Sequence, residues 1–126
     1  MIKEGYRSKA KDWGYYTVKK VARLQKPVEC HSQDKGKALF NPVIVKLEWD
    51  IPPSDDKHDI WFPYWITWSD ISEKERYGQY APMLGEKALL ELLEDAIRQD
   101  FFSKDFLAKL TGIISKKLDK QNGGSG

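Results

Sequence analysis

The spacing of apolar residues changes once along this chain, and that change limits the fold more than any other feature of the sequence. Between residues 15 and 68, apolar and polar residues tend to alternate, which is the period of a half-buried strand. Between residues 84 and 118, apolar residues recur every three or four positions, which is the period of an amphipathic helix. Strands followed by helices predict the α+β class: an antiparallel three- or four-stranded sheet followed by two C-terminal amphipathic helices packed on one face.

Breaks in the alternation set the limits of the expected strands. Lys26 and Pro27 stop the first one, and the polar stretch 52–59 separates the next two. Lys20 and Val21 interrupt the alternation of the first strand, so a helix remains an alternative there. The expected extended segments are Tyr15–Leu24, Val28–Ser32, Val43–Asp50 and Ile60–Trp68.

The second half carries the signals of helix starts. Asp70 and Ser72 are each followed by a glutamate three residues later, which is the spacing of a capping box and predicts a short helical turn. An amphipathic helix is expected from about Leu84 to Arg98, and Ser103 is the expected cap of a second one. The residues of the second helix expected to face the core are Phe106, Leu107, Leu110, Ile113, Ile114 and Leu118.

Length and composition indicate one folded domain. A chain of 126 residues can bury a core without a disulfide or a metal, and we expect one domain over residues 1–120. Its 40% hydrophobic and 32% charged residues are typical of a globular, non-membrane protein. A single cysteine, Cys30, and an N-terminus without the apolar stretch of a secretory signal predict a cytoplasmic protein. Residues 121–126 have the composition of a flexible Gly/Ser tail, of the kind that cloning leaves behind.

The segment from Trp61 to Trp68 is the most unusual part of the sequence, because five of its eight residues are aromatic. A strand packed against helices on one side should be polar on the other, but this strand would carry apolar groups on both. Three explanations are open. Residues 1–13, with Tyr6 and Trp13, fold back over the outer face, or a protein partner covers it, or a small ligand binds there.

We therefore expect a non-catalytic interaction module that engages a protein partner or a second copy of itself as a homodimer, with no cofactor and no metal. Tryptophan and tyrosine supply much of the binding energy at protein interfaces. Pro63 is typical of an edge strand, which is open to pairing with another chain. The expected partner-binding residues are Trp61, Tyr64, Trp65, Trp68, Tyr77 and Tyr80.

An uneven charge distribution supports a second hypothesis, the binding of single-stranded nucleic acid. Residues 1–26 hold eight basic and two acidic residues, although the whole chain carries only +2. A ring and several cations on one open strand face would stack a base and pair with phosphates. The competing explanation is that this basic segment neutralises the acidic stretch 48–59 of the same fold. The residues of this alternative site are Tyr15, Lys19, Lys20 and Arg23.

A third hypothesis is a small metal-dependent hydrolase or nuclease built on Lys46, Glu48 and Asp50. In such sites, acids hold a metal ion that activates water. A solvated polar strand face is the competing explanation for the same residues. The acidic turn 55–59 lacks the glycine and distal glutamate of a calcium loop. Cys30 and the histidine next to it would point to opposite faces of a strand, so they are not expected to form a catalytic pair.

Overall fold

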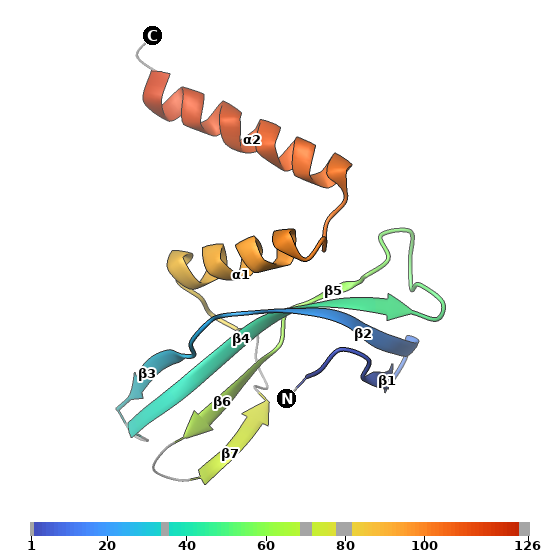
Figure 1. Ribbon diagram of the computed structural model, residues 1–126, viewed down its shortest axis with the longest axis vertical. Coiled ribbons are helices and arrows are strands. Elements are labelled where there is room, and N and C mark those ends of the chain that lie inside the picture. Colours follow the sequence, from blue (N-terminus) through green and yellow to red (C-terminus); the bar gives the residue numbers. More distant parts are fainter. Residues whose placement is uncertain (1, 34–35, 69–71, 78–81, 124–126) are drawn as a thin grey trace.

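The computed structural model describes residues 2–33, 36–68, 72–77 and 82–123. Within these residues, seven strands are followed by two helices, and all strand pairs are antiparallel (Figure 1). The expected α+β class, with an antiparallel sheet and two C-terminal helices, is therefore confirmed, but the described sheet has seven strands rather than the expected three or four. The elements are β1 (Arg7–Ala10), β2 (Gly14–Arg23), β3 (Val28–Ser32), β4 (Gly36–Trp49), β5 (Ile60–Trp61), β6 (Tyr64–Trp68), β7 (Ser72–Tyr77), α1 (Glu86–Arg98) and α2 (Lys104–Gly123).

Strand β4 is the centre of the sheet and is hydrogen-bonded along both edges. On one edge, β2 pairs with its C-terminal half and β3 with its N-terminal half. On the other edge, β5 pairs with the C-terminal half of β4 and β6 with its N-terminal half. β1 pairs with the outer edge of β2, and β7 with the outer edge of β6. Pro27 separates β2 from β3, and Pro63 separates β5 from β6, because proline cannot donate to a ladder. The Pro63 carbonyl still accepts a hydrogen bond from the Val43 amide at 3.1 Å.

The expected strands all lie in this sheet, but their limits differ. β4 begins at Gly36 rather than at Val43, and the expected strand 60–68 is divided into β5 and β6. The expected helical turn after Ser72 is wrong: residues 72–77 form β7, which pairs with β6. Pairing across the β6–β7 hairpin outweighs the local capping-box spacing there. Asp70 lies outside the described residues.

A β-bulge in β2 explains why its sequence alternation is irregular. The register with β4 shifts between Val18 and Lys20. The extra residue, Lys19, allows Val18 and Val21 to enter the same apolar cluster, although an odd number of positions separates them. The segment is therefore a strand, and its helical alternative is wrong.

Each face of the sheet has its own apolar core. On the face away from α1, the buried residues are Ile2, Val18, Val21, Val43, Val45, Leu47 and Trp65. Under α1 they are Ala22, Ile44, Leu92, Ala96 and Phe101. The N-terminal segment runs along the edge of β2, where the Gly5 amide donates to the Val18 carbonyl at 2.7 Å and the Val18 amide donates to the Tyr6 carbonyl at 2.8 Å. These bonds bring Ile2 into the first core.

The two helices are placed differently. α1 packs on β2 and β4, and the Asp95 carboxylate on α1 accepts a hydrogen bond from the Arg23 amide at 2.9 Å. By contrast, α2 contacts no other helix or strand in the described part of the chain, and Figure 1 shows it standing beyond α1. The expectation that the second helix packs on the sheet face is therefore corrected. No helix among the described residues is both long and apolar enough to cross a membrane.

The burial of Trp65 leads to a stability prediction. Trp65→Ala is expected to lower the free energy of unfolding by about 3–5 kcal/mol, because it removes a large ring from a packed core and leaves a cavity. Urea denaturation followed by far-UV circular dichroism measures this change. Ile51→Ala, at a residue that is exposed, is the control and is expected to change stability by less than about 0.5 kcal/mol. Equal effects of the two substitutions would contradict this placement of Trp65.

Candidate functional site

The aromatic segment is divided between the interior and the surface. Trp65 is only 2% exposed and belongs to the same core cluster as Ile2. The Arg23 guanidinium lies 6.0 Å from the centre of the Trp65 ring and donates to the Ile2 carbonyl at 2.6 Å. The first residues of the chain thus help to cover Trp65, as one of the three sequence-based explanations proposed. Trp61, by contrast, is 38% exposed.

The other residues expected to bind a partner do not gather around Trp61. Tyr64 is half-buried, and its ring centre lies 5.2 Å from that of Phe40 on β4. Tyr80 lies outside the described residues, and so do the side chains of Trp68 and Tyr77. The described structure therefore leaves Trp61 as the exposed tryptophan of the expected set.

Trp61 lies beside three aromatic residues that come from other parts of the chain. Tyr16 on β2 is paired in register with Trp49 at the end of β4, and their ring centres are 5.3 Å apart. The Tyr16 ring also lies 6.3 Å from Trp61, and the Trp49 ring lies 6.2 Å from Trp13. We call these four residues, Trp13, Tyr16, Trp49 and Trp61, the aromatic cluster.

Local backbone features explain why the members of the cluster meet. Trp13 lies in the turn between β1 and β2, and this hairpin closes with Gly14 at φ +96°, a conformation that favours glycine. Trp61 on β5 is in register with Val45 on β4, and β4 lies between Trp61 and Tyr16 on β2. All of these residues belong to the sheet face away from α1, because Tyr16 and Trp49 pack on the core there.

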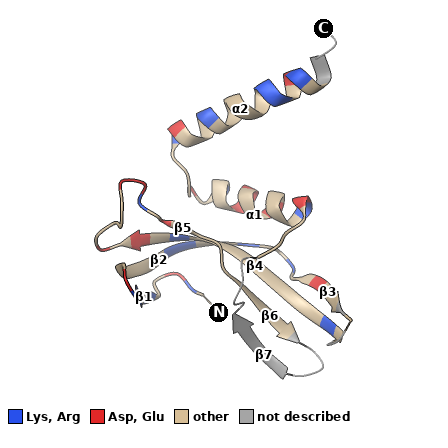
Figure 2. Cartoon of the chain, turned by 180° about the vertical axis from the view of Figure 1, so that it is seen from behind, with Lys and Arg blue, Asp and Glu red and all other residues tan. Residues whose placement is uncertain are grey.

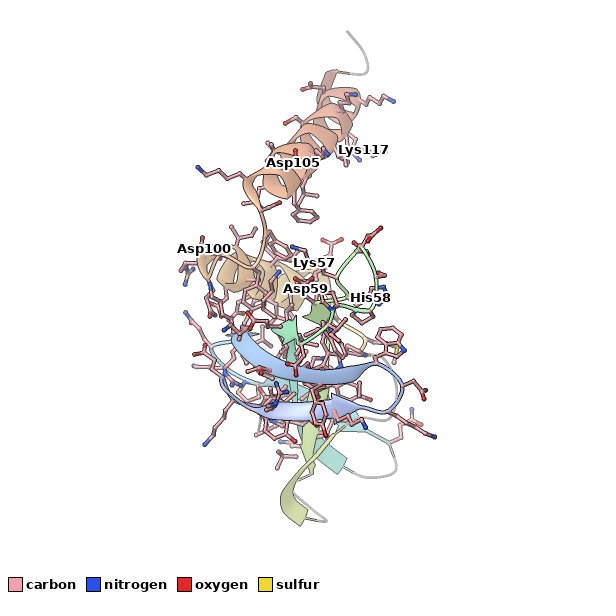
Figure 3. All side chains as sticks on the ribbon, turned by 90° about the vertical axis from the view of Figure 1, so that its right-hand side faces the viewer. Lys57, His58, Asp59, Asp100, Asp105 and Lys117 are labelled. Carbon is pink, nitrogen blue, oxygen red and sulfur yellow. The ribbon has the colours of Figure 1, made fainter. Side chains whose placement is uncertain are left out.

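The aromatic cluster lines a pocket of about 640 Å³, which is within the size range of small-ligand sites. The loop between β4 and β5 supplies Asp56, His58 and Asp59 to its wall. Figure 3 shows His58 and Asp59 on this loop, which stands at the end of the sheet. The His58 ring lies 4.9 Å from Trp13 in an edge-to-face arrangement.

This loop is held to the sheet by several hydrogen bonds. The Trp49 indole N–H donates to the His58 carbonyl at 2.8 Å, and the Leu47 amide donates to the Asp59 carbonyl at 2.8 Å. The Lys46 ammonium forms an ion pair with Asp59 at 2.6 Å. Lys57 and His58 both have positive φ, a strained conformation for residues other than glycine that such contacts must hold in place. The pocket wall is thus preorganised.

Sequence reasoning found Trp61 but did not predict the pocket. The sequence indicates Trp13 only as a cover for the aromatic strand, and it does not single out Trp49 as a site residue. Each cluster member lies on, or close to, the end of a strand, and the hairpin and the register of β4 bring these ends together. In the sequence, Trp13, Trp49 and Trp61 lie near the limits of the expected strands, but this placement does not say which strand ends meet.

The four residues of the alternative nucleic-acid site do not form one ladder. Lys20 donates to the Gln99 carbonyl on the α1 side of the sheet, whereas Arg23 lies over Trp65 on the opposite side. Lys20 and Arg23 are three positions apart in the regular part of β2, after the bulge, so their side chains point to opposite faces of the sheet. Lys19 forms an ion pair with Glu48 at 3.6 Å, so part of the basic segment neutralises acidic residues of the same fold.

Tyr15, the fourth residue of that alternative, is already in contact with cations of this chain. The Arg7 guanidinium lies 5.1 Å from the centre of its ring, and the Lys9 ammonium lies 5.6 Å away. The ring is half exposed. These contacts occupy the face on which a nucleic acid base was expected to stack.

The three residues of the hydrolase hypothesis each have a partner of opposite charge. Lys46 is paired with Asp59, Glu48 with Lys19, and Asp50 with Arg7. No group of three or more histidine, cysteine or acidic side chains among the described residues is arranged to hold a metal ion.

Cys30 has no histidine brought to it from the other end of the sheet. Cys30 lies on β3 beside the N-terminal end of β4, whereas His58 lies by the C-terminal end of β4. These two residues are therefore not brought together.

Comparisons with known proteins add no relative. No model of a protein family matches the chain, no curated protein is similar to it, and no solved structure matches its fold.

The Arg7–Asp50 pair leads to a prediction on pH. Arg7 donates two hydrogen bonds to the Asp50 carboxylate, one of them 2.8 Å long. The hydrogen bond from Arg7 lowers the pKa of Asp50 below that of an ordinary aspartate. Because the pKa is lowered in the folded state, the pair stabilises the fold above about pH 4, and this contribution is lost as the pH falls through the lowered pKa.

Arg7→Gln is expected to raise the pKa of Asp50 towards that of an ordinary aspartate. NMR titration of the side-chain carboxyl carbon measures this pKa directly. Lys19→Gln removes a cation from the neighbouring strand and serves as the control, in which the Asp50 pKa is expected to stay low. A low Asp50 pKa in both variants would show that Arg7 is not its cause.

Proposed function

We propose that this protein is a non-catalytic binding module whose aromatic pocket holds a cationic side chain of a protein partner. The observation that supports this proposal is the convergence of Trp13, Tyr16, Trp49 and Trp61 around one pocket. These rings come from four separate segments of the chain. Pairing of the strands does not by itself require these four rings to lie around one pocket. Their convergence therefore favours a role in binding.

The charges around the pocket favour a cation over an anion. The faces of aromatic rings carry partial negative charge and attract ammonium groups. The acidic residues Asp56 and Asp59 line the pocket, and no lysine or arginine among the described residues does. Asp59 is paired with Lys46, so Asp56 is the carboxylate best suited to a bound cation.

A methylated lysine fits this pocket better than an unmodified one. An ammonium ion that leaves water loses strong hydrogen bonds, and the pocket offers mainly aromatic surface in exchange. Methyl groups remove those hydrogen bonds and keep the positive charge, and recognition of such groups by clustered rings is a known use of the cation–π interaction. The same cluster would bind an apolar group through the hydrophobic effect alone, and the experiment below separates the two.

The proposal is tested with a peptide that carries trimethyllysine and a second peptide in which a neutral carbon replaces the quaternary nitrogen. The trimethyllysine peptide is expected to bind about tenfold more tightly, because only the cation interacts with the ring faces and Asp56. NMR shifts of the Trp13, Trp49 and Trp61 indole N–H groups report the binding site and the dissociation constants. Equal affinity for the two peptides would overturn the cationic specificity, and no shift at millimolar peptide would overturn the pocket as the binding site.

Substitutions in the pocket extend this test. Trp61→Ala is expected to weaken binding of the trimethyllysine peptide by about tenfold, because one wall of the aromatic cluster is lost. Asp56→Asn is expected to weaken this peptide more than its neutral counterpart. Tyr6→Ala is the matched control: Tyr6 is 55% exposed but does not line the pocket, so binding is expected to be unchanged.

A further inference from the structure

Helix α2 presents an apolar stripe that the rest of the described chain contacts only at its start, where the Phe106 ring stacks on Phe102 with ring centres 4.8 Å apart. The helix stands apart from the sheet and from α1 in Figures 1 and 3, and contacts no other element. Ile113, near the middle of the stripe, is 67% exposed. A helix with an uncovered apolar stripe usually gains its stability by packing against a partner. The residues of this α2 stripe are Phe106, Leu107, Leu110, Ile113, Ile114 and Leu118.

Helix α1 carries a second apolar stripe in addition to the one that it buries. Leu92 and Ala96 face the sheet and are fully buried. Leu90, which is 68% exposed, and the exposed Ile97 are seven residues apart and therefore share the opposite face of the helix. We call Leu90 and Ile97 the outer stripe of α1; Leu93, between them in sequence, packs against the core under the helix.

The connection between the helices keeps the two stripes apart within one chain. α1 ends in a Schellman motif, in which Asp100 has φ +62° and the Phe101 amide donates to the Ala96 carbonyl at 3.0 Å. Phe101 is buried in the core under α1, and the Gln99 side chain donates to the Val21 carbonyl at 3.0 Å. Two residues later, Ser103 caps α2 by accepting a hydrogen bond from the Phe106 amide at 3.1 Å. The direction of α2 is thus set by an anchored connection.

The two helices carry opposite net charges. α2 holds five lysines and two aspartates, a net charge of +3, and Figure 2 shows its basic segments along the helix. α1 holds four acidic and two basic residues, a net charge of −2. Its exposed Glu86 and Glu94 lie on the same side as Leu90, by the helical spacing of three or four residues. The charges on α2 and on α1 therefore favour contact between the two helices.

We propose that α2 packs its apolar stripe on the outer stripe of α1 in a second copy of this chain. Reciprocal packing of this kind gives a dimer with two-fold symmetry, in which each chain contributes one α1 and one α2 to each contact. The connection that Phe101 and Gln99 anchor leads α2 away from α1 of its own chain. An anionic membrane surface would match the lysines of α2, but it would leave the outer stripe of α1 uncovered and repel Glu86 and Glu94. A second copy covers both stripes.

The oligomeric state of the full chain is the first test. Sedimentation equilibrium is expected to give twice the chain mass of 14.6 kDa. Ile113→Glu and Leu90→Glu should each weaken the dimer by at least about tenfold, because each places an unpaired charge in an apolar contact. Ala108→Glu, at an exposed position on the side of α2 away from the stripe, is the matched control and should leave the dimer intact. A monomeric native chain, or a dimer that neither stripe variant weakens, would overturn the proposal.

Cross-linking identifies which helices meet. In a Cys30→Ser background, Leu90→Cys and Ile113→Cys place one thiol near the middle of each stripe, and a flexible bismaleimide joins thiols that lie close together. Mixing the two single-cysteine proteins is expected to yield a covalent dimer of one chain of each kind. Cross-linking of Ile113→Cys with itself alone would show α2–α2 pairing instead. A cross-link within a chain that carries both cysteines, with no cross-link between chains, would show closure on its own α1. Either result would overturn the exchange.

Binding of the native chain to anionic phosphatidylserine vesicles, in place of dimer formation, would identify a membrane as the occupant of the α2 stripe and would also overturn the proposal. The inference does not rest on the aromatic pocket, which lies on the other face of the sheet. If one of the two proposals fails its test, the other proposal is therefore unaffected.

Discussion

Strand β4 must satisfy backbone hydrogen bonds along both edges over its whole length, and the positions of the other elements follow from this requirement. β4 is 14 residues long, and each of the strands that pair with it is shorter, so no one of them satisfies a whole edge. Each edge is therefore shared by two shorter strands that meet near a proline, at Pro27 on one side and Pro63 on the other. These breaks occur near the middle of β4, so the sheet keeps its pairing while its neighbours are interrupted.

The same pairing creates the aromatic pocket. Register places Tyr16 across from Trp49 and places Trp61 across from Val45, so three rings from separate strands share one face. The loop after β4 then closes against this face through the Trp49 indole and the Lys46–Asp59 pair. The wall of the proposed site is thus a consequence of strand register. Residues of the loop supply its charge.

The helices show how one anchored turn can leave an apolar surface bare. Burial of Phe101 and the hydrogen bonds of Gln99 hold the end of α1 on β2, and α2 begins immediately afterwards. The end of α1 is thus fixed on the sheet, and α2 leaves it without contacting α1. Exchange of α2 between two copies would bury both stripes without changing that core, which is why the second copy is the partner that the connection favours.

The sequence by itself determined the α+β class, the segments of β2 to β6 and both helices, because the period of apolar residues depends only on local backbone geometry. It also singled out Trp61. The tertiary structure alone decided the bulge at Lys19, the strand at residues 72–77, the burial of Trp65 and the meeting of Trp13 with Trp49. It also decided that α2 remains apart from the sheet. These features depend on which distant segments pair and on the angle of one turn, and periodicity carries no information about either.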